Sequence, residues 1–313
     1  MGAFSVSEEV LVLTSGGNTE RQYVWYDRKG NILERTVARG LVFDLSLSPD
    51  EKRVVFRKID PATRNQDLWL LDLTRNTQSR FTFDNAPDDD PVWSPDGSTI
   101  VYDAHRNGVA NMHLKAATGA ANPDLLLESG VANYPMDWSR DGRYIMYQVN
   151  DQKTRADIWL LPVQGEKKPF AYLESEFVET DGRFSPDGEW VAYASNENGK
   201  YEVFIQHVPR TGGKWQVSVN GGAAPSWRRD GRELYYLAPD RKLMAVEIRT
   251  NGSAIEAGIP VALFETTVDS YSAPNRYAAS ADGRRFLSNS SLIEAGMKPI
   301  TVVLNWRGRI TGQ

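Results

Sequence analysis

A five-residue motif recurs along the chain at nearly constant spacing, and this repeat constrains the fold more than any other feature. It reads Trp-Ser-Pro-Asp-Gly at residues 93–97. Related or looser copies occupy residues 47–51, 138–142, 184–188, 227–231 and 280–283. The aspartates of successive copies stand 43 to 52 residues apart. Because one four-stranded blade of a β-propeller takes about 40–50 residues, the repeat predicts a propeller.

Each copy of the motif predicts a tight turn between two strands. Proline presets the backbone at the second turn position, aspartate bonds to nearby main chain, and glycine accepts the left-handed conformation that closes the turn. Segments rich in β-branched and aromatic residues follow, as at residues 53–56 and 99–102, and indicate the second strand of each unit. Residues 67–73 and 80–83 are typical of a third and a fourth strand. We therefore expect the motif's aspartates to shape turns and not to bind ligands.

The number of blades depends on how the first residues are interpreted. Residues 4–13 align with residues 45–56 if the turn is shortened, and residues 22–27 and 32–37 then read as a third and a fourth strand. This adds a seventh unit to the six that carry the motif. A ring must also close, since an open array leaves a free sheet edge. The sequence therefore predicts an all-β, seven-bladed β-propeller of four-stranded antiparallel blades, with residues 1–313 as a single domain and six blades as the alternative.

Tryptophan recurs in one position of the repeat. Trp93, Trp138 and Trp227 open three copies of the motif, and Phe184 opens a fourth. Large aromatic side chains at repeat spacing are typical of packing between neighbouring repeat units. We therefore expect these side chains to lie between blades, where they would stabilise the ring, and not in a cofactor site.

Composition excludes several classes of protein. The chain has no cysteine, so disulfides, thiolate metal sites and a cysteine nucleophile are excluded. With 36 basic and 41 acidic residues the formal charge is −5, which argues against a nucleic-acid partner, since such binding needs a basic face. No apolar run approaches the ~20 residues of a membrane span, and the first residues lack the basic and apolar regions of a signal peptide. We expect no membrane insertion of this chain and no signal peptide in this sequence.

The histidines do not share one face of a strand pair. A hairpin turn at residues 107–108 pairs His113 with Tyr102. The same register pairs His105 with Ala110 and puts the two histidines on opposite faces of the sheet. The third histidine belongs to another blade, and no Gly-x-Ser-x-Gly elbow of a serine hydrolase occurs. We therefore predict no metal site and no catalytic residue.

Polar residues precede several of the predicted inner strands. Loops that enter inner strands converge on the mouth of a propeller's central channel, so we expect these residues to meet there. Carboxylates at such a mouth could bind a cation, a basic peptide or a sugar, or act as acid and base. We expect no resident cofactor, although a cation in the central channel fits the same carboxylates. The candidate ligand-binding residues are Asp44, Asp90, Tyr134, Asp181, Asn275 and Arg276.

The repeated motif and the strands that follow it resemble the TolB-like, WD-repeat-like propeller family. Residues 80–84, 213–218, 243–247 and 299–306 are most similar to the C-terminal propeller region of acidobacterial serine/threonine kinase-like proteins. That resemblance implies a kinase domain, a membrane helix and then this propeller as an extracytoplasmic or periplasmic sensor. This chain itself has no glycine-rich kinase loop, no His-Arg-Asp and no Asp-Phe-Gly, so it does not encode kinase activity.

Together these observations predict a non-catalytic binding module. The expected ligand is a protein, a peptide or a small molecule, bound at the channel mouth and the blade-top loops, and the expected state is a monomer. One alternative is a lyase or hydrolase that uses carboxylates at the channel mouth. The other is a purely structural or oligomerising ring, since a shared propeller fold does not fix a function.

Overall fold

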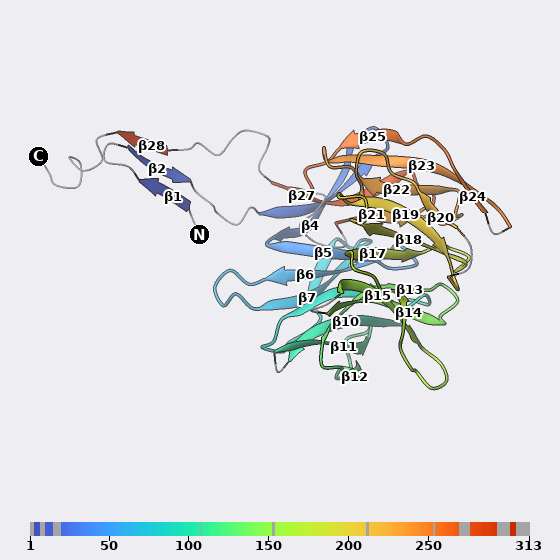
Figure 1. Cartoon of the computed structure of the whole chain (residues 1–313). Coiled ribbons are helices and arrows are strands. Elements are labelled where there is room, and N and C mark those ends of the chain that lie inside the picture. The colour runs from blue at the N-terminus through green and yellow to red at the C-terminus, as the bar shows by residue number, and fades with distance from the viewer. Residues whose placement is uncertain are drawn as a thin grey trace, which may run out of the picture.

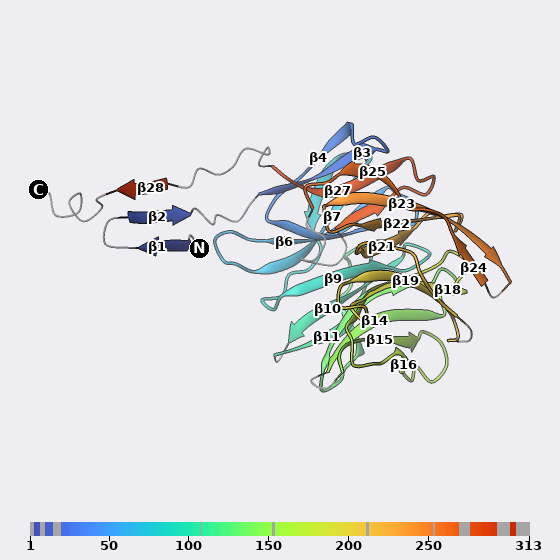
Figure 2. The same ribbon diagram turned by 45° about the horizontal axis from the view of Figure 1, so that its top comes forward.

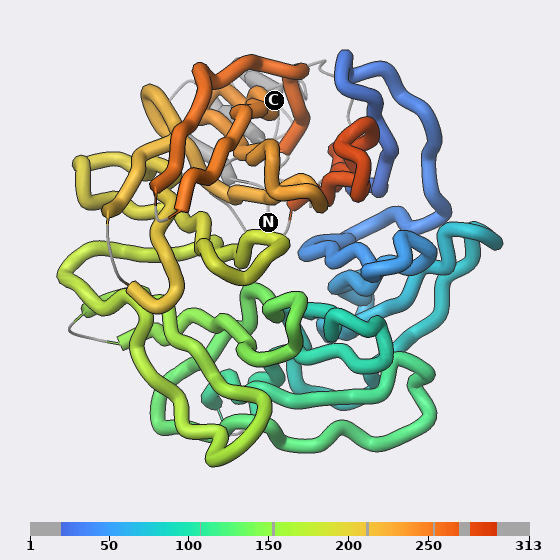
Figure 3. Tube along the Cα trace, turned by 90° about the vertical axis from the view of Figure 1, so that its right-hand side faces the viewer, coloured from blue at the N-terminus to red at the C-terminus, as the bar shows by residue number. Residues whose placement is uncertain are grey.

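All regular structure in the described part of the chain is β-strand (Figure 1). The computed structural model describes residues 3–6, 10–14, 20–106, 108–151, 154–210, 213–252, 254–268, 276–292 and 301–304. Six sheets, each built on four antiparallel strands, surround a central axis, and Figure 3 shows the ring face-on. Within the described residues no helix is long and apolar enough to cross a membrane.

Five of the sheets use strands that follow one another in sequence. The first sheet contains β5 (Val42–Leu47), β6 (Arg53–Ile59), β7 (Gln66–Asp72) and β8 (Thr77–Arg80). The second contains β9 (Asp88–Trp93), β10 (Thr99–Arg106), β11 (Val109–Ala116) and β12 (Asp124–Leu127). The third contains β13 (Ala132–Trp138), β14 (Tyr144–Asp151), β15 (Arg155–Pro162) and β16 (Phe170–Leu173). The fourth contains β17 (Glu179–Phe184), β18 (Trp190–Ser195), β19 (Glu202–His207) and β20 (Lys214–Gln216). The fifth contains β21 (Ala223–Trp227), β22 (Glu233–Leu237), the long β23 (Lys242–Asn251), and both β24 (Ala254–Ala257) and β25 (Val261–Glu265), which pair with β23.

The sixth sheet closes the ring with strands from distant parts of the sequence. It contains β26 (Tyr277–Ala279), β27 (Arg285–Ser291), β3 (Arg21–Asp27) and β4 (Ile32–Gly40). Strand β27 pairs with β3 over its whole length, from Arg285 opposite Asp27 to Ser291 opposite Arg21. In Figure 3 these red and blue segments lie side by side.

This closure corrects the predicted blade number from seven to six. The strands expected to be the third and fourth of a seventh unit are β3 and β4, and they complete the sheet that β26 and β27 begin. Two incomplete units therefore make one blade, because the free edge of β27 is satisfied by main-chain hydrogen bonds to β3. Strands β1 (Ala3–Val6) and β2 (Val10–Thr14) pair instead with β28 (Thr301–Leu304) in a separate three-stranded sheet, seen beside the ring in Figures 1 and 2.

The repeated motif forms the predicted turn. The Ser94 hydroxyl donates to Asp96 Oδ1 at 2.6 Å and accepts the main-chain N–H of Thr99 at 2.9 Å. Gly97 has a φ of 71°, and its N–H donates to the carbonyl of Ser94 at 2.9 Å. The motif's aspartate in this blade is thus a turn former, as expected.

The hydrophobic core lies between neighbouring sheets. Val55 of β6 and Tyr102 of β10, both fully buried, belong to one cluster together with Trp93 of β9. The Trp93 indole N–H also crosses between blades, because it donates to the carbonyl of Ser46 on β5 at 2.9 Å. The prediction that this position packs between blades is confirmed for Trp93.

Candidate functional site at the two ends of the central channel

The first strands of the six sheets, here called the inner strands, are β5, β9, β13, β17, β21 and β26. Each begins at one end of the channel, the loop end, and runs to the motif turn at the other, the turn end. Residues of all six inner strands and their following turns line one cavity of about 410 Å³ at the turn end. A cavity of this volume is in the range that proteins use for small ligands or single side chains of a partner.

Two arginines stand where most copies of the motif carry a smaller residue. The third position of the motif, directly before its aspartate, lines this cavity in every blade, and its occupants are Pro49, Pro95, Arg140, Pro186, Arg229 and Ala281. Burial, and then the nearby charge of Arg229, lowers the pKa of the Arg140 guanidinium. The two cations are therefore close enough to repel each other.

The cavity as a whole carries excess positive charge. Arg183 and Arg276 also line it, against the carboxylates of Glu51 and Asp137. Both carboxylate oxygens of Asp137 accept hydrogen bonds from main-chain N–H groups, one from Trp138 at 2.9 Å and one from Phe184 at 2.8 Å. This carboxylate therefore has a structural role in holding the backbone. Burial raises the pKa of Asp137, although the charge of Arg183 opposes this shift. The four arginines, named here the arginine cluster, are Arg140, Arg183, Arg229 and Arg276.

Three of the predicted site residues occupy one structural position near the loop end. Asp44, Asp90 and Asp181 stand six residues before the motif's aspartate in their blades. Their φ angles are 44°, 46° and 57°, and Ala224 in the same position has 52°. The pairing register shifts here in each of the four sheets, which marks a β-bulge. Aspartate tolerates positive φ better than most residues, which gives these carboxylates a structural role in the bulge.

The structure brings four of the six predicted residues within reach of one another's charge. The charge of Asp44 helps to raise the pKa of Asp90, and the charge of Arg276 opposes the rise in the pKa of Asp44. The charge of Asp90 in turn helps to raise the pKa of Tyr134. Asp181 instead accepts the main-chain N–H of Ala224 at 3.0 Å, which ties two inner strands together. The sixth predicted residue, Asn275, lies outside the described residues.

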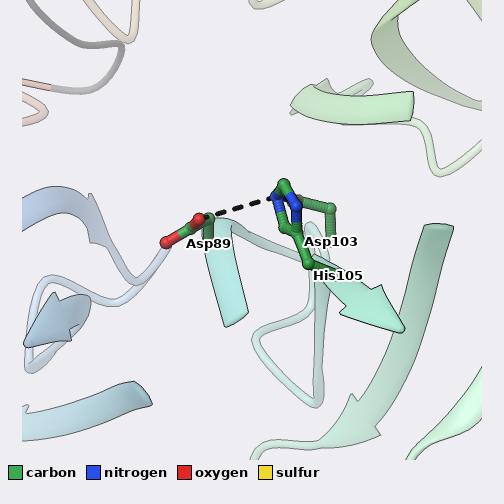
Figure 4. A group of neighbouring side chains, drawn as sticks. All are labelled: Asp89, Asp103 and His105. Carbon is green, nitrogen blue, oxygen red and sulfur yellow. Dashed lines mark ion pairs between the residues drawn. The ribbon is translucent and has the colours of Figure 1, made fainter. Parts of the chain in front are cut away.

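A group of side chains at the loop end was missed by the sequence analysis (Figure 4). His105 Nε2 lies 3.3 Å from Asp103 Oδ2 and 3.8 Å from Asp89 Oδ2. Asp103 and His105 are two residues apart on β10, so their side chains lie on the same face of the sheet. Asp89 of β9 pairs directly with Asp103. The Asp-x-His spacing was a usable signal, but the position of Asp89 depends on a register that the sequence alone did not provide.

Burial disfavours the charged forms of the carboxyl groups at the loop end. Burial raises the pKa of Asp44 to about 6, with the charge of Asp89 acting in the same direction. It raises the pKa of Asp90 and Asp103 well above the usual range, again with help from neighbouring carboxylates. Arg57 lies among them, with Nε 2.5 Å from Asp44 Oδ2 and 3.2 Å from Asp89 Oδ1. Arg57, together with the charge of Arg276 on Asp44, thus opposes four carboxylates, named here the acidic cluster: Asp44, Asp89, Asp90 and Asp103.

Comparisons with curated sequences give relatives of modest identity. No family model matches the chain. A tricorn protease homolog of Streptomyces coelicolor is 27% identical over 105 residues, which is 33% of this chain and 10% of that protein. An uncharacterised protein of Agrobacterium fabrum is 26% identical over 183 residues, covering 54% of this chain and 61% of the relative. An uncharacterised peptidase of Bacillus subtilis is 24% identical over 50% of this chain and 29% of its own length. The chain therefore spans less than two thirds of each of these relatives.

Solved structures show the same architecture more broadly. A putative TolB from Agrobacterium tumefaciens superposes with a TM-score of 0.68 at 18% identity, over 89% of this chain and 100% of that one. TolB from Acinetobacter baumannii gives a TM-score of 0.58 at 17% identity, over 79% of this chain and 67% of that one. A prolyl endopeptidase gives 0.51 at 14% identity, over 93% of this chain and 50% of that one. At such identities the likeness concerns the fold, and by fold this chain is a TolB-like β-propeller.

Proposed function

We propose that this chain is a non-catalytic binding module that holds an anionic group of its ligand in the cavity at the turn end. The observation that carries the proposal is the pair Arg140 and Arg229, which replace proline or alanine at the cavity mouth. Arginine binds carboxylate and phosphate groups through two parallel hydrogen bonds. An anion between these two side chains would also relieve their mutual repulsion.

The ligand class follows from the size and charge of the cavity. Its volume of about 410 Å³ admits a small organic anion or an acidic side chain or terminus of a partner, but not a folded domain. We infer that a protein, peptide or small-molecule ligand presents a carboxylate or phosphate there. The resemblance to kinase-like proteins and the TolB-like fold favour an extracytoplasmic sensor or interaction domain, and both the location and the parent protein are part of this proposal.

The test restores the repeat at the two positions that depart from it. Arg140→Pro together with Arg229→Pro installs the residue that three other copies carry, so the turns should keep their conformation. Citrate, inorganic phosphate and a glutamate-rich peptide are suitable probes, and fluorescence of the cavity-lining tryptophans reports their binding. We expect saturable binding of at least one probe to the wild-type protein, and about tenfold or more weaker binding to the double variant.

The control is Arg249→Ala, which removes one arginine from β23, outside the lining of the cavity. This variant should bind the probes as the wild-type protein does. Equal probe affinity in the wild-type protein and the proline double variant would refute the proposal.

A second candidate function, a lyase or hydrolase, is favoured by one observation. Asp103 and His105 are in contact, and the ring of Tyr134 lies 6.2 Å from that of His105. A histidine beside a carboxylate is a familiar acid–base pair. One solved structure with this fold, at a TM-score of 0.55, is an oligogalacturonate lyase in complex with manganese. Turnover of a polyuronate or a chromogenic ester or peptide that is lost in Asp103→Asn would overturn the non-catalytic proposal.

A further inference from the structure

We propose that Asp89, Asp103 and His105 form a binding site for a first-row divalent metal ion at the loop end of the channel. This site is separate from Arg140 and Arg229, which belong to the motif turns at the turn end. It therefore goes beyond the proposed anion-binding function and does not depend on it.

The geometry of the three side chains fits one ion. Their donor atoms, one from each residue, all lie within 4.8 Å of one another. Metal bonds of about 2.0–2.2 Å require donor separations of about 3–3.5 Å, so the 3.3 Å between His105 Nε2 and Asp103 Oδ2 already matches. Asp89 Oδ2, at 3.8 Å from the same nitrogen, needs only a small side-chain adjustment.

The burial of Asp103 independently favours the binding of a cation. Its side chain has no exposed surface, and neither carboxylate oxygen accepts a hydrogen bond from any residue that the structure describes. A buried carboxylate without such donors is costly unless a cation or a metal compensates it. Its contact with His105 offers only a partner whose charge depends on protonation.

The surrounding charges leave room for a divalent ion. Arg57 Nε forms an ion pair with Asp89 Oδ1 at 3.2 Å. The other oxygen of Asp89, Oδ2, is the one that lies near His105. Arg57 and Arg276 supply two positive charges against the four carboxylates of the acidic cluster, and a divalent ion would bring this group close to neutrality. Access exists, because the His105 side chain is 34% exposed.

The donor set selects the kind of metal. Calcium and magnesium prefer oxygen ligands alone, whereas an imidazole nitrogen with two carboxylates suits Mn²⁺ or Zn²⁺. Three protein donors also leave coordination positions for water or for a ligand.

The experiment measures metal binding to the full chain after treatment with a chelator. Loss of the free Mn²⁺ signal in electron paramagnetic resonance, and calorimetric titration with Zn²⁺, report occupancy. We expect binding with one ion per chain in the wild-type protein, and affinity about tenfold or more lower in Asp103→Asn and in His105→Gln. His207→Gln, on β19 of another blade, is the matched control and should bind as the wild-type does.

The outcomes separate this proposal from the others. Absence of Mn²⁺ and Zn²⁺ binding in the wild-type protein, or unchanged affinity in both ligand variants, overturns it. Should Asp103→Asn not fold, the half-buried His105→Gln carries the test alone, with melting curves in the absence of metal as the check on folding. The Arg140→Pro and Arg229→Pro double variant should retain full metal affinity, so a failure of the anion proposal leaves this result independent.

Discussion

Two tryptophans in the same repeat position should respond differently to the same substitution. The Trp93 indole N–H donates to the Ser46 carbonyl at 2.9 Å, whereas the Trp138 indole nitrogen is buried and has no hydrogen-bond partner among the described residues. Replacement by phenylalanine removes the same ring atoms at both positions, and Trp93 is buried whereas Trp138 is partly buried. At Trp93 it also removes an inter-blade hydrogen bond, which contributes about 1 kcal/mol. At Trp138 it removes an unsatisfied donor, whose burial costs about 1–3 kcal/mol.

We therefore expect Trp93→Phe to lower the free energy of unfolding by about 2–4 kcal/mol more than Trp138→Phe does. Urea denaturation followed by far-UV circular dichroism measures both variants, and unfolding rates measure the same difference if the equilibrium transition is not two-state. The wild-type protein and the Trp93→Phe, Trp138→Phe double variant complete the cycle and measure the coupling between these two positions, which line the same cavity. Equal losses in the two single variants would refute the hydrogen-bond reasoning.

Two further predictions concern close packing and pH. Gly182→Ala should destabilise the protein by about 1–3 kcal/mol, because a Cβ at Gly182 would lie in direct conflict with the Met146 sulfur; a melting temperature equal to that of the wild type would contradict this. Burial raises the pKa of Asp137 in the folded protein above its unfolded-state pKa of about 4. The contribution of this group to the free energy of unfolding is therefore fully present below about pH 4 and is lost as the pH rises through the folded-state pKa. Asp137→Asn should therefore flatten the decline of stability with rising pH in this interval, measured by denaturant titrations at several pH values, and an unchanged slope would count against the assignment.

Local patterns predicted most of the blade architecture. The motif fixed the turn at residues 94–97, and the hairpin register that places His113 opposite Tyr102 and His105 opposite Ala110 is confirmed. These features depend on residues close in sequence, where turn chemistry and strand alternation decide the result. The blade number was wrong because β27 and β3 pair across most of the chain, and no local pattern records such a partnership.

The site was predictable only where it coincides with the repeat. The positions of Asp44, Asp90 and Asp181 relative to the motif are visible in the sequence, but their left-handed backbone is not. The contact of Asp89 with His105 depends on an irregular β9–β10 register, which shifts between Val101 and Asp103. Departures from the repeat, such as arginine in the proline position, are visible in the sequence. Only the structure shows that these arginines line one cavity.

The sheet that closes the ring has a consequence for how the chain reaches its native state. During synthesis β3 and β4 emerge before the other strands of the ring, yet β3 gains its inner neighbour only when β27 has been made. Until then five blades form an open arc, and the unpaired edge of β3 accepts any strand of matching pattern. We expect closure to be the slow step, because its contacts join the strands of the ring that lie farthest apart in the sequence. At high concentration the β3–β4 hairpin of one molecule can pair with β27 of another. We therefore expect exchange of this hairpin to be the route to a domain-swapped dimer.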